Sequence, residues 1–262
     1  MLLTAFGHLD IAVIGPALLA GMLVLASAAP LGLIIARRRG PFTCLALAQT
    51  AALGVTAGQA FWGAPNVLAV QVSALVAALA CGALLTGLQR RSRAPDVAAA
   101  LMFAMAAALQ LALLSHAPDG TAQLRNMLAG WDVTLSPKLL VGTVLLAFAA
   151  LMIWWLQDTI RTPLVLNLVL AVVAGVAVQI VGLLLVLVSV TLPAAAVRRA
   201  PGSWQPLMAF NVGALGYAVG LVASAMLAIP AGPAIVCVMI PLGLAADQAI
   251  GLIFGRGVRP PI

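Results

Sequence analysis

Residues 163–197 read PLVLNLVLAVVAGVAVQIVGLLLVLVSVTLPAAAV, and this stretch decides the fold because it is apolar and carries no charge. Its 35 residues would form a helix roughly 52 Å long at about 1.5 Å per residue. The hydrocarbon core of a bilayer is only about 30 Å thick. We therefore expect the chain to reverse at Gly182, with one span over about 163–181 and a shorter one over about 183–197.

The rest of the chain has the same character. Of 262 residues, 64% are hydrophobic and 7% are charged, whereas soluble domains are about 45–50% apolar and about 25% charged. One soluble core cannot bury that much apolar surface. The net charge of +7 alone could suggest nucleic acid, but a nucleic-acid binder needs its basic residues on a polar surface. The composition indicates one membrane domain over 1–262.

Proline, glycine and charged residues divide the remaining sequence into runs near the ~20 apolar residues that one crossing requires. These runs cover about 15–36, 44–61, 66–88, 97–115, 138–156, 207–229 and 231–254. The expected fold class is therefore all-α. It is a polytopic membrane bundle of eight to nine spans with a glycine-broken helix pair at about 163–197.

The basic residues predict the orientation, because Lys and Arg concentrate in cytoplasmic loops. Nine crossings with the N-terminus out and the C-terminus in place 11 of the 13 basic residues on the cytoplasmic side. Only Arg125 and Lys138 then lie outside. With eight crossings, Arg198 and Arg199 would also move outside, so the charge pattern favours nine.

Motifs of soluble enzymes are missing. The sequence contains no HExxH, GxSxG or P-loop string, so we expect a chain that is not an enzyme and binds no cofactor. Any ATP would be bound by a partner. The cysteines Cys44, Cys81 and Cys237 lack CxxC spacing and are predicted to be small buried residues.

Polar residues at membrane depth are the candidates for function, since they are costly there and usually face the bundle interior. The alternative is that they hold the helices together by hydrogen bonds. The GxxxG pairs Gly54/Gly58 and Gly216/Gly220 indicate close helix packing. The polar set is Gln49, Thr50, Gln71, Gln110, Asn167, Gln179, Asn211 and Asp247.

Two stretches resemble the membrane subunits of zinc and manganese ABC importers, the ABC-3 family. Residues 16–58, PALLAGMLVLASAAPLGLIIARRRGPFTCLALAQTAALGVTAG, are similar to its first two helices and their Arg-Arg pair. Residues 181–199, VGLLLVLVSVTLPAAAVRR, are similar to its VGxLLVxALLIxPAAxAxx segment. The helix at 207–229 and the following Ile229-Pro230-Ala231-Gly232-Pro233-Ala234 look like its last hairpin.

The resemblance implies a permease of an ATP-driven importer for zinc or another divalent metal ion, in the inner membrane of a bacterium. It implies a homodimer in membrane lipid, with an ATPase subunit on the cytoplasmic side and a periplasmic or extracellular solute-binding protein. Nucleic acid is not implied. The alternatives are the same fold importing a non-metal or chelated solute, or a membrane scaffold or regulatory subunit that transports nothing.

The family's metal-binding Asp and His match Leu45 and Gln49, so the metal ligands stay unknown. The residues that we predict for the translocation path are Cys44, Gln49, Thr50, Gln179 and Asp247. Those that we predict for the ATPase contact are Arg38, Arg39, Asp158 and Arg161. The connector at 157–162 is about ten residues shorter than in relatives, so the ATPase contact could instead be rebuilt from 37–41, 90–96 and 198–206.

Overall fold

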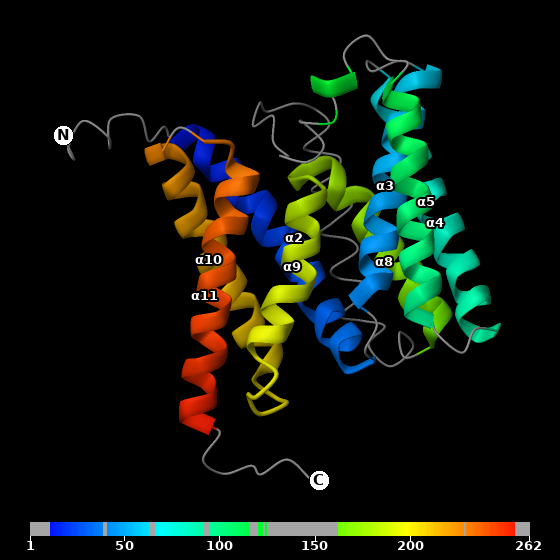
Figure 1. Cartoon of the computed structure of the whole chain (residues 1–262). Helices are drawn as coiled ribbons and strands as arrows, with labels where there is room; N and C mark the ends of the chain where they lie inside the picture. Colours follow the sequence, from blue (N-terminus) through cyan, green and yellow to red (C-terminus); the bar gives the residue numbers. More distant parts are fainter. Residues whose placement is uncertain are drawn as a thin grey trace.

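The structure is a computed structural model that describes residues 11–38, 41–62, 66–91, 95–115, 120–122, 124, 162–227 and 229–254. In these ranges it contains helices and no strand, which confirms the all-α prediction. Figure 1 shows the helices packed side by side as a bundle. They are α2 (Ile11–Arg38), α3 (Pro41–Trp62), α4 (Val67–Arg91), α5 (Pro95–Ser115), α8 (Pro163–Val181), α9 (Leu183–Ala196), α10 (Gln205–Leu227) and α11 (Ala231–Phe254).

The helix boundaries follow the local sequence. Pro41, Pro95 and Pro163 each begin a helix, a position where proline's missing N–H would have no helical partner anyway. Within the described ranges, seven helices are long and apolar enough to cross a membrane, and α9 is a shorter apolar helix of 14 residues. The expected spans coincide with these helices, except for 138–156, which lies outside the described residues.

The long apolar stretch does break at Gly182. This residue has φ 83° and ψ 164°, a conformation that glycine adopts without the steric cost of a Cβ. Its N–H donates to the Val178 carbonyl at 3.1 Å, and its own carbonyl accepts from the Val186 N–H at 3.1 Å. The backbone polar groups of the break therefore stay paired, as membrane depth requires. In Figure 1, α8 rises to the break and α9 descends from it.

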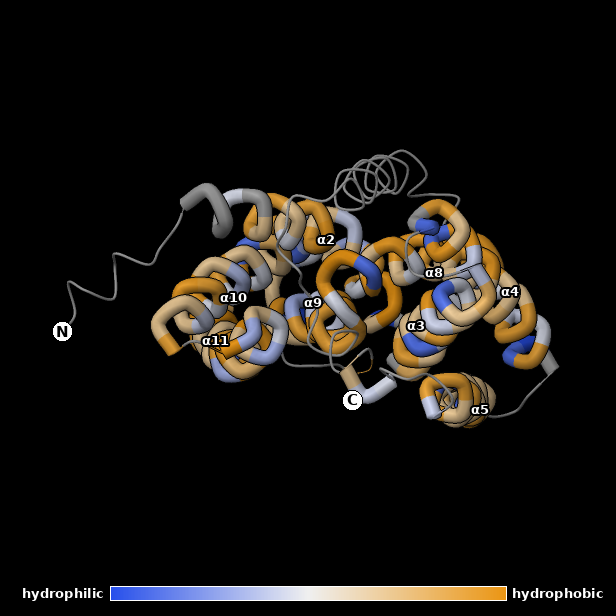
Figure 2. The backbone as a smooth tube through the Cα atoms, turned by 90° about the horizontal axis from the view of Figure 1, so that it is seen from above, coloured by the Kyte–Doolittle hydropathy of each residue, from blue (hydrophilic) through white to orange (hydrophobic). Residues whose placement is uncertain are grey.

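The helices form two groups that meet along a seam. One group consists of α3, α4, α5 and α8, and the other of α2, α9, α10 and α11. The seam is made where α8 meets α2 and α9, and where α3 meets α9. Figure 2, which views the bundle end-on, shows the two groups side by side. The Gly182 break thus connects one group directly to the other.

Close packing depends on glycine at several helix crossings. A Cβ built on Gly54 would lie 2.6 Å from the Ser73 carbonyl oxygen of α4, and one on Gly220 would lie 2.5 Å from the Ile235 Cα of α11. A Cβ on Gly32 would collide with the Val190 carbonyl of α9. The GxxxG pairs therefore allow backbones to approach, as small residues do in membrane bundles.

The described basic helix ends gather at one end of the bundle. Helices α2, α4 and α9 all run downward in Figure 1. Arg37 and Arg38 end α2, Arg90 and Arg91 end α4, and Arg198 and Arg199 follow α9. Helices α5 and α8 both run upward in Figure 1.

Candidate functional site

Helix α3 is the centre of the buried polar contacts. Gln49 of α3 is 5% exposed, and its Nε2 donates to Oε1 of Gln110 on α5 at 2.6 Å. The Gln110 Nε2 in turn donates to the Thr56 hydroxyl of α3 at 3.3 Å. Gln110 is 3% exposed and Thr56 is 3% exposed. Two amides and a hydroxyl therefore join α3 to α5 inside an otherwise apolar contact, which we call the α3/α5 amide bridge.

A second polar cluster joins α4, α8 and α3 nearer the end where α4 stops. Asn167 of α8 donates from Nδ2 to the Thr86 hydroxyl at 2.9 Å and to Oε1 of Gln89 at 3.3 Å. The Gln89 Nε2 donates to the Thr43 hydroxyl of α3 at 3.0 Å. Asn167 is 4% exposed. In the helix group of α3, α4, α5 and α8, polar side chains therefore join α5 to α3, α8 to α4, and α4 to α3.

Cys44 and Thr50, both predicted to lie on the path, are also buried on α3. Cys44 is fully buried in the apolar core. The Thr50 hydroxyl donates to the Ala46 carbonyl at 2.6 Å, four residues earlier in its own helix. The Thr50 side chain also forms a hydrogen bond with the side chain of Cys81 on α4. Leu45, at the position that the resemblance assigns to a metal-binding Asp, is half-buried. In this conformation the Thr50 hydroxyl has its partners within the chain, and Cys44 packs in the apolar core.

Gln179 and Asp247 lie apart from that cluster. Gln179 of α8 is half-buried, and its Nε2 donates to the Gly175 carbonyl of the same helix at 2.9 Å. Asp247 lies on α11, in the other group of helices. The five predicted path residues are thus brought together only in part: Cys44, Gln49 and Thr50 share α3, and the other two belong elsewhere.

Asp247 instead belongs to an ionic cluster at the lower end. Its Oδ1 lies 3.6 Å from Nε of both Arg198 and Arg199. That oxygen is buried and accepts no hydrogen bond, so only the two guanidinium charges compensate it. A Cβ on Gly251, one turn along α11, would lie 2.5 Å from Nη1 of Arg199. The absence of a side chain at Gly251 gives the arginine its place beside the carboxylate.

The predicted ATPase contact falls mostly outside the described residues. Arg39, Asp158 and Arg161 lie outside them, and Arg38 is the last residue of α2. Beside it, Nη2 of Arg37 donates to Oε1 of Gln205 at 2.8 Å, which fixes the end of α2 to the start of α10. This contact lies at the same end of the bundle as Arg198 and Arg199.

Sequence reasoning missed several of these partners. It placed Gln49, Gln110 and Asn167 at membrane depth but could not pair them, and it passed over Thr43, Thr86 and Gln89. Gln89 stands directly before Arg90 and Arg91 in the sequence, where it looks like part of a solvated helix end. Its amide in fact points inward to Asn167. The signal available was its spacing of three residues from Thr86, which places both on one helix face.

The comparisons with known proteins decide the family. The sequence matches the profile of the ABC 3 transport family over residues 10–160 and 158–248, most of its length. The chain belongs to the ABC 3 transport family. With its seven apolar helices in the described ranges, it is an integral membrane protein and a permease of ABC type. The family supplies the membrane subunit of the transporter, which is not itself the catalytic one.

Solved structures show the same fold as this ABC 3 family chain. PsaBC from Streptococcus pneumoniae in complex with a Fab matches at a TM-score of 0.76 and 18% identity, over 97% of this chain and 99% of that chain. A protein assigned to the metal-chelate type of ABC transporters, in an inward-facing conformation, matches at 0.67 and 15% identity, over 92% and 89%. At these identities the likeness establishes the fold alone.

The polar groups around α3 of this ABC 3 family chain are neutral, whereas the ionic cluster of Asp247 lies on α11. No three His, Cys, Asp or Glu side chains gather in the described part of the chain. The buried polar groups around α3 are amides, hydroxyls and a thiol, which are weaker ligands for zinc or manganese than carboxylate, imidazole or thiolate. The α3/α5 amide bridge can donate and accept hydrogen bonds, and it can open if α5 moves away from α3.

Proposed function

We propose that this chain is the permease of an ATP-driven importer whose cargo is zinc or another divalent metal ion. The whole of 1–262 would act as one membrane domain. It would bind no cofactor, since ATP would be hydrolysed by a partner subunit, and a solute-binding protein would deliver the cargo from outside. The observation that carries this proposal is the family match along most of the chain.

The proposed path follows α3 and includes Gln49, Thr50 and Cys44, with Gln179 and Asp247 as more distant members. In the described conformation the Gln49 amide is held by Gln110. Transport would therefore require a second conformation in which α5 shifts and the amide bridge opens. In the closed state such polar groups would bind one another, and in the open state they would bind the cargo or water.

Two copies of the chain would form the transporter. Helices α5 and α11 have the smallest buried fractions among the described spans, 33% and 22% of their apolar windows. Figure 2 shows both helices along the same side of the bundle, with α3 and α9 set back between them. A second copy covering this side would enclose a space next to α3. This arrangement supports a homodimer whose path lies between the two copies.

The ATPase would bind the end of the bundle that carries the arginines. Arg37, Arg90, Arg198 and Arg199 lie there, and basic residues favour the cytoplasmic side. This supports the N-out, C-in orientation in a bacterial inner membrane. Of the predicted contact residues, Arg38 ends α2 at this side, and Arg39, Asp158 and Arg161 lie outside the described residues.

A second candidate function is import of a chelated metal or of a non-metal solute. The observation that favours it is the amide bridge itself: Gln49 stands where the resemblance puts a histidine, and its partner Gln110 is also an amide. Neutral amides bind a hydrogen-bonding solute better than a bare divalent cation. A non-transporting scaffold or regulatory subunit is the remaining alternative.

Uptake measurements test these proposals. The chain is expressed together with an ATPase subunit and a solute-binding protein that co-purify with it, in a strain that lacks other zinc importers. Uptake of radiolabelled zinc is then measured for the free ion and for a zinc chelate. Uptake of free zinc that requires ATP supports the first candidate. Uptake only of the chelate supports the second. If deletion of this gene leaves the uptake of both forms unchanged, the cargo is neither free nor chelated zinc.

A further inference from the structure

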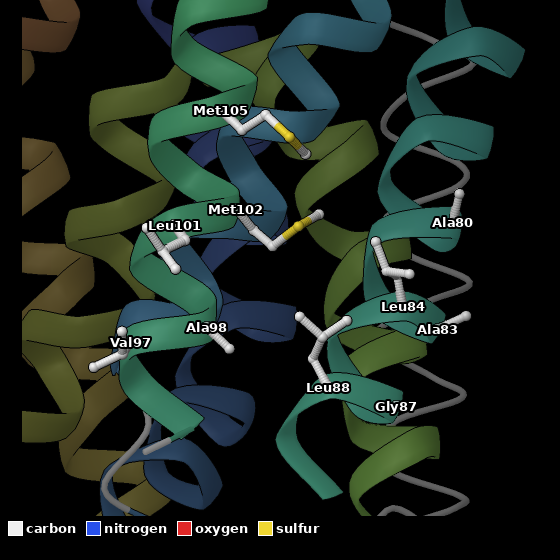
Figure 3. A pocket seen from close by; sticks show the side chains of 10 residues that line it. All are labelled: Ala80, Ala83, Leu84, Gly87, Leu88, Val97, Ala98, Leu101, Met102 and Met105. Atoms are coloured by element: carbon white, nitrogen blue, oxygen red, sulfur yellow. The ribbon is translucent and has the colours of Figure 1, made fainter. Parts of the chain in front are cut away.

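A groove between α4 and α5 lies outside the polar clusters described above. Its volume is about 930 Å³, and Figure 3 shows Met102 of α5 and Leu88 of α4 projecting into it from opposite sides. The side chains that line it are all apolar. They are Ala80, Ala83, Leu84, Gly87, Leu88, Val97, Ala98, Leu101, Met102 and Met105.

The groove exists because the two helices pack loosely where α4 presents small residues. Helix α4 packs more extensively against α3 and α8 than against α5. Along its groove side it carries Ala80, Ala83 and Gly87, and a Cβ built on Gly87 would meet no heavy atom within 4 Å. Gly54 of α3, by contrast, has backbone atoms of α4 against it. The space at Gly87 is therefore open.

The groove lies at membrane depth and faces outward. Helices α4 and α5 are both membrane spans, and Leu84, Leu101 and Met105 expose 51%, 66% and 51% of their surface. Water has no hydrogen-bond partner in an apolar space of this kind. A hydrocarbon chain is therefore the ligand that matches these apolar side chains.

A positive charge stands at the lower end of the groove. Arg90 follows Gly87 by three residues, or about 4.5 Å along the helix axis, and it is exposed. Helix α4 ends one residue later at Arg91. Basic pockets beside transmembrane helices attract the headgroups of anionic lipids. The apolar groove and the cation are therefore aligned as the tail and the headgroup of a lipid are.

We propose that the α4/α5 groove binds an anionic phospholipid, with one acyl chain along Ala83 and Gly87 and the phosphate at Arg90. A second copy packed through its own α4 and α5 would also fill the apolar part, and this face carries one acidic residue, Asp96 in the first turn of α5. Arg90 and Arg91 outnumber it there, so the net charge of a second copy's face is positive, like that of the groove, and does not compensate Arg90. The charge complementarity therefore favours the lipid. This site is separate from the proposed path, and its existence does not depend on which cargo is transported.

Lipid retention measures the site directly. The purified full chain is reconstituted with phosphatidylglycerol and phosphatidylcholine of identical acyl chains in equal amounts, and bound lipid is counted by native mass spectrometry after mild extraction. We expect phosphatidylglycerol to be retained about fivefold more than phosphatidylcholine. Arg90→Gln should abolish that preference, while Arg37→Gln, which removes a cation from the same end on α2, should leave it intact.

Gly87→Leu tests the groove itself. The new side chain enters open space, so the protein should fold, and retention of both lipids should fall to the background of bulk lipid. Gly15→Leu is the matched control, since a Cβ there also meets nothing within 4 Å, and it should not change retention. Equal retention of the two lipids by the native chain would overturn the proposal. Unchanged lipid retention in Gly87→Leu would also overturn it. A shift of that variant from dimer to monomer would do the same, because it would show that the groove binds a second copy of the chain.

Discussion

The side-chain amides of Gln49 on α3 and Gln110 on α5 form a buried hydrogen bond, with Nε2 of Gln49 2.6 Å from Oε1 of Gln110. The residues are 61 positions apart in the sequence. Apart from Gln110, the buried residues of α5 are small or apolar, such as Ala99, Ala106 and Leu114. The amide bridge is thus a specific polar contact on a helix that is otherwise held by packing.

Removing one partner of the amide bridge should cost stability and show whether Gln49 serves transport. Gln110→Leu leaves the Gln49 amide unpaired in an apolar site, a loss of about 1–3 kcal/mol in the free energy of unfolding. Gln49→Leu with Gln110→Leu should recover most of that loss, as a thermal-unfolding series in detergent would show.

The double variant also separates path from packing. If Gln49 lines the path, uptake by the Gln49→Leu/Gln110→Leu protein falls although its stability recovers. If the amides only join the helices, uptake returns together with stability. The proposal that Gln49 belongs to the path would not survive the second outcome.

The spans and the break at Gly182 could be predicted from the sequence, whereas the polar pairings could not. Span length is fixed by the thickness of the bilayer, so a charge-free run such as 163–197 must contain a reversal. The rotation of each helix about its own axis, by contrast, cannot be predicted from span length. The spans are apolar on every side, so no polar face fixes which way Gln49 points, and its partner on α5 depends on how the helices pack.

A methyl group at Gly32 should disturb the contact between α2 and α9. A Cβ there collides with the carbonyl of Val190, a backbone atom that cannot move aside as a side-chain end can. Gly32→Ala should therefore lower the free energy of unfolding by an amount typical of overpacking, about 1–3 kcal/mol, and the midpoint of thermal unfolding should fall with it. Gly15→Ala lies on the same helix with open space around it, so its unfolding midpoint should equal or exceed that of the native chain. Equal behaviour of the two variants would show that α2 and α9 do not approach this closely.

Tyr217 should contribute more through its ring than through its hydroxyl. The side chain is fully buried, its ring lies against Gly21 of α2, and its hydroxyl is 2.9 Å from Oγ of Ser189. Tyr217→Phe loses only that hydrogen bond, which is worth about 0.6 kcal/mol on average between membrane helices. Tyr217→Ala leaves a cavity and should cost about 3–5 kcal/mol. Thermal unfolding of the two variants beside Ser189→Ala measures the difference, and a Phe variant as unstable as the Ala variant would refute it.

The ion pairs of Asp247 should add little to stability, and this makes the residue a clean test of the path. Arg198 and Arg199 are 65% and 48% exposed in their side chains, so solvent screens both pairs and Asp247→Asn should change the free energy of unfolding by less than about 1 kcal/mol. That change should shrink further in high salt. If uptake nevertheless falls in this stably folded variant, Asp247 acts in transport. Unchanged uptake would remove it from the proposed path.

Replacing Gly182 should damage the fold more than its small size suggests. At φ 83° any side chain is strained, by about 1–2 kcal/mol for a residue forced into the left-handed region. The strain acts where α8 passes into α9 and where the two helix groups are joined. Gly182→Ala should therefore lower both the unfolding midpoint and uptake. Gly87→Ala is the control, because alanine favours a helix over glycine and has room there. An unfolding midpoint as high in Gly182→Ala as in the native chain would mean that the apolar stretch does not reverse at this residue.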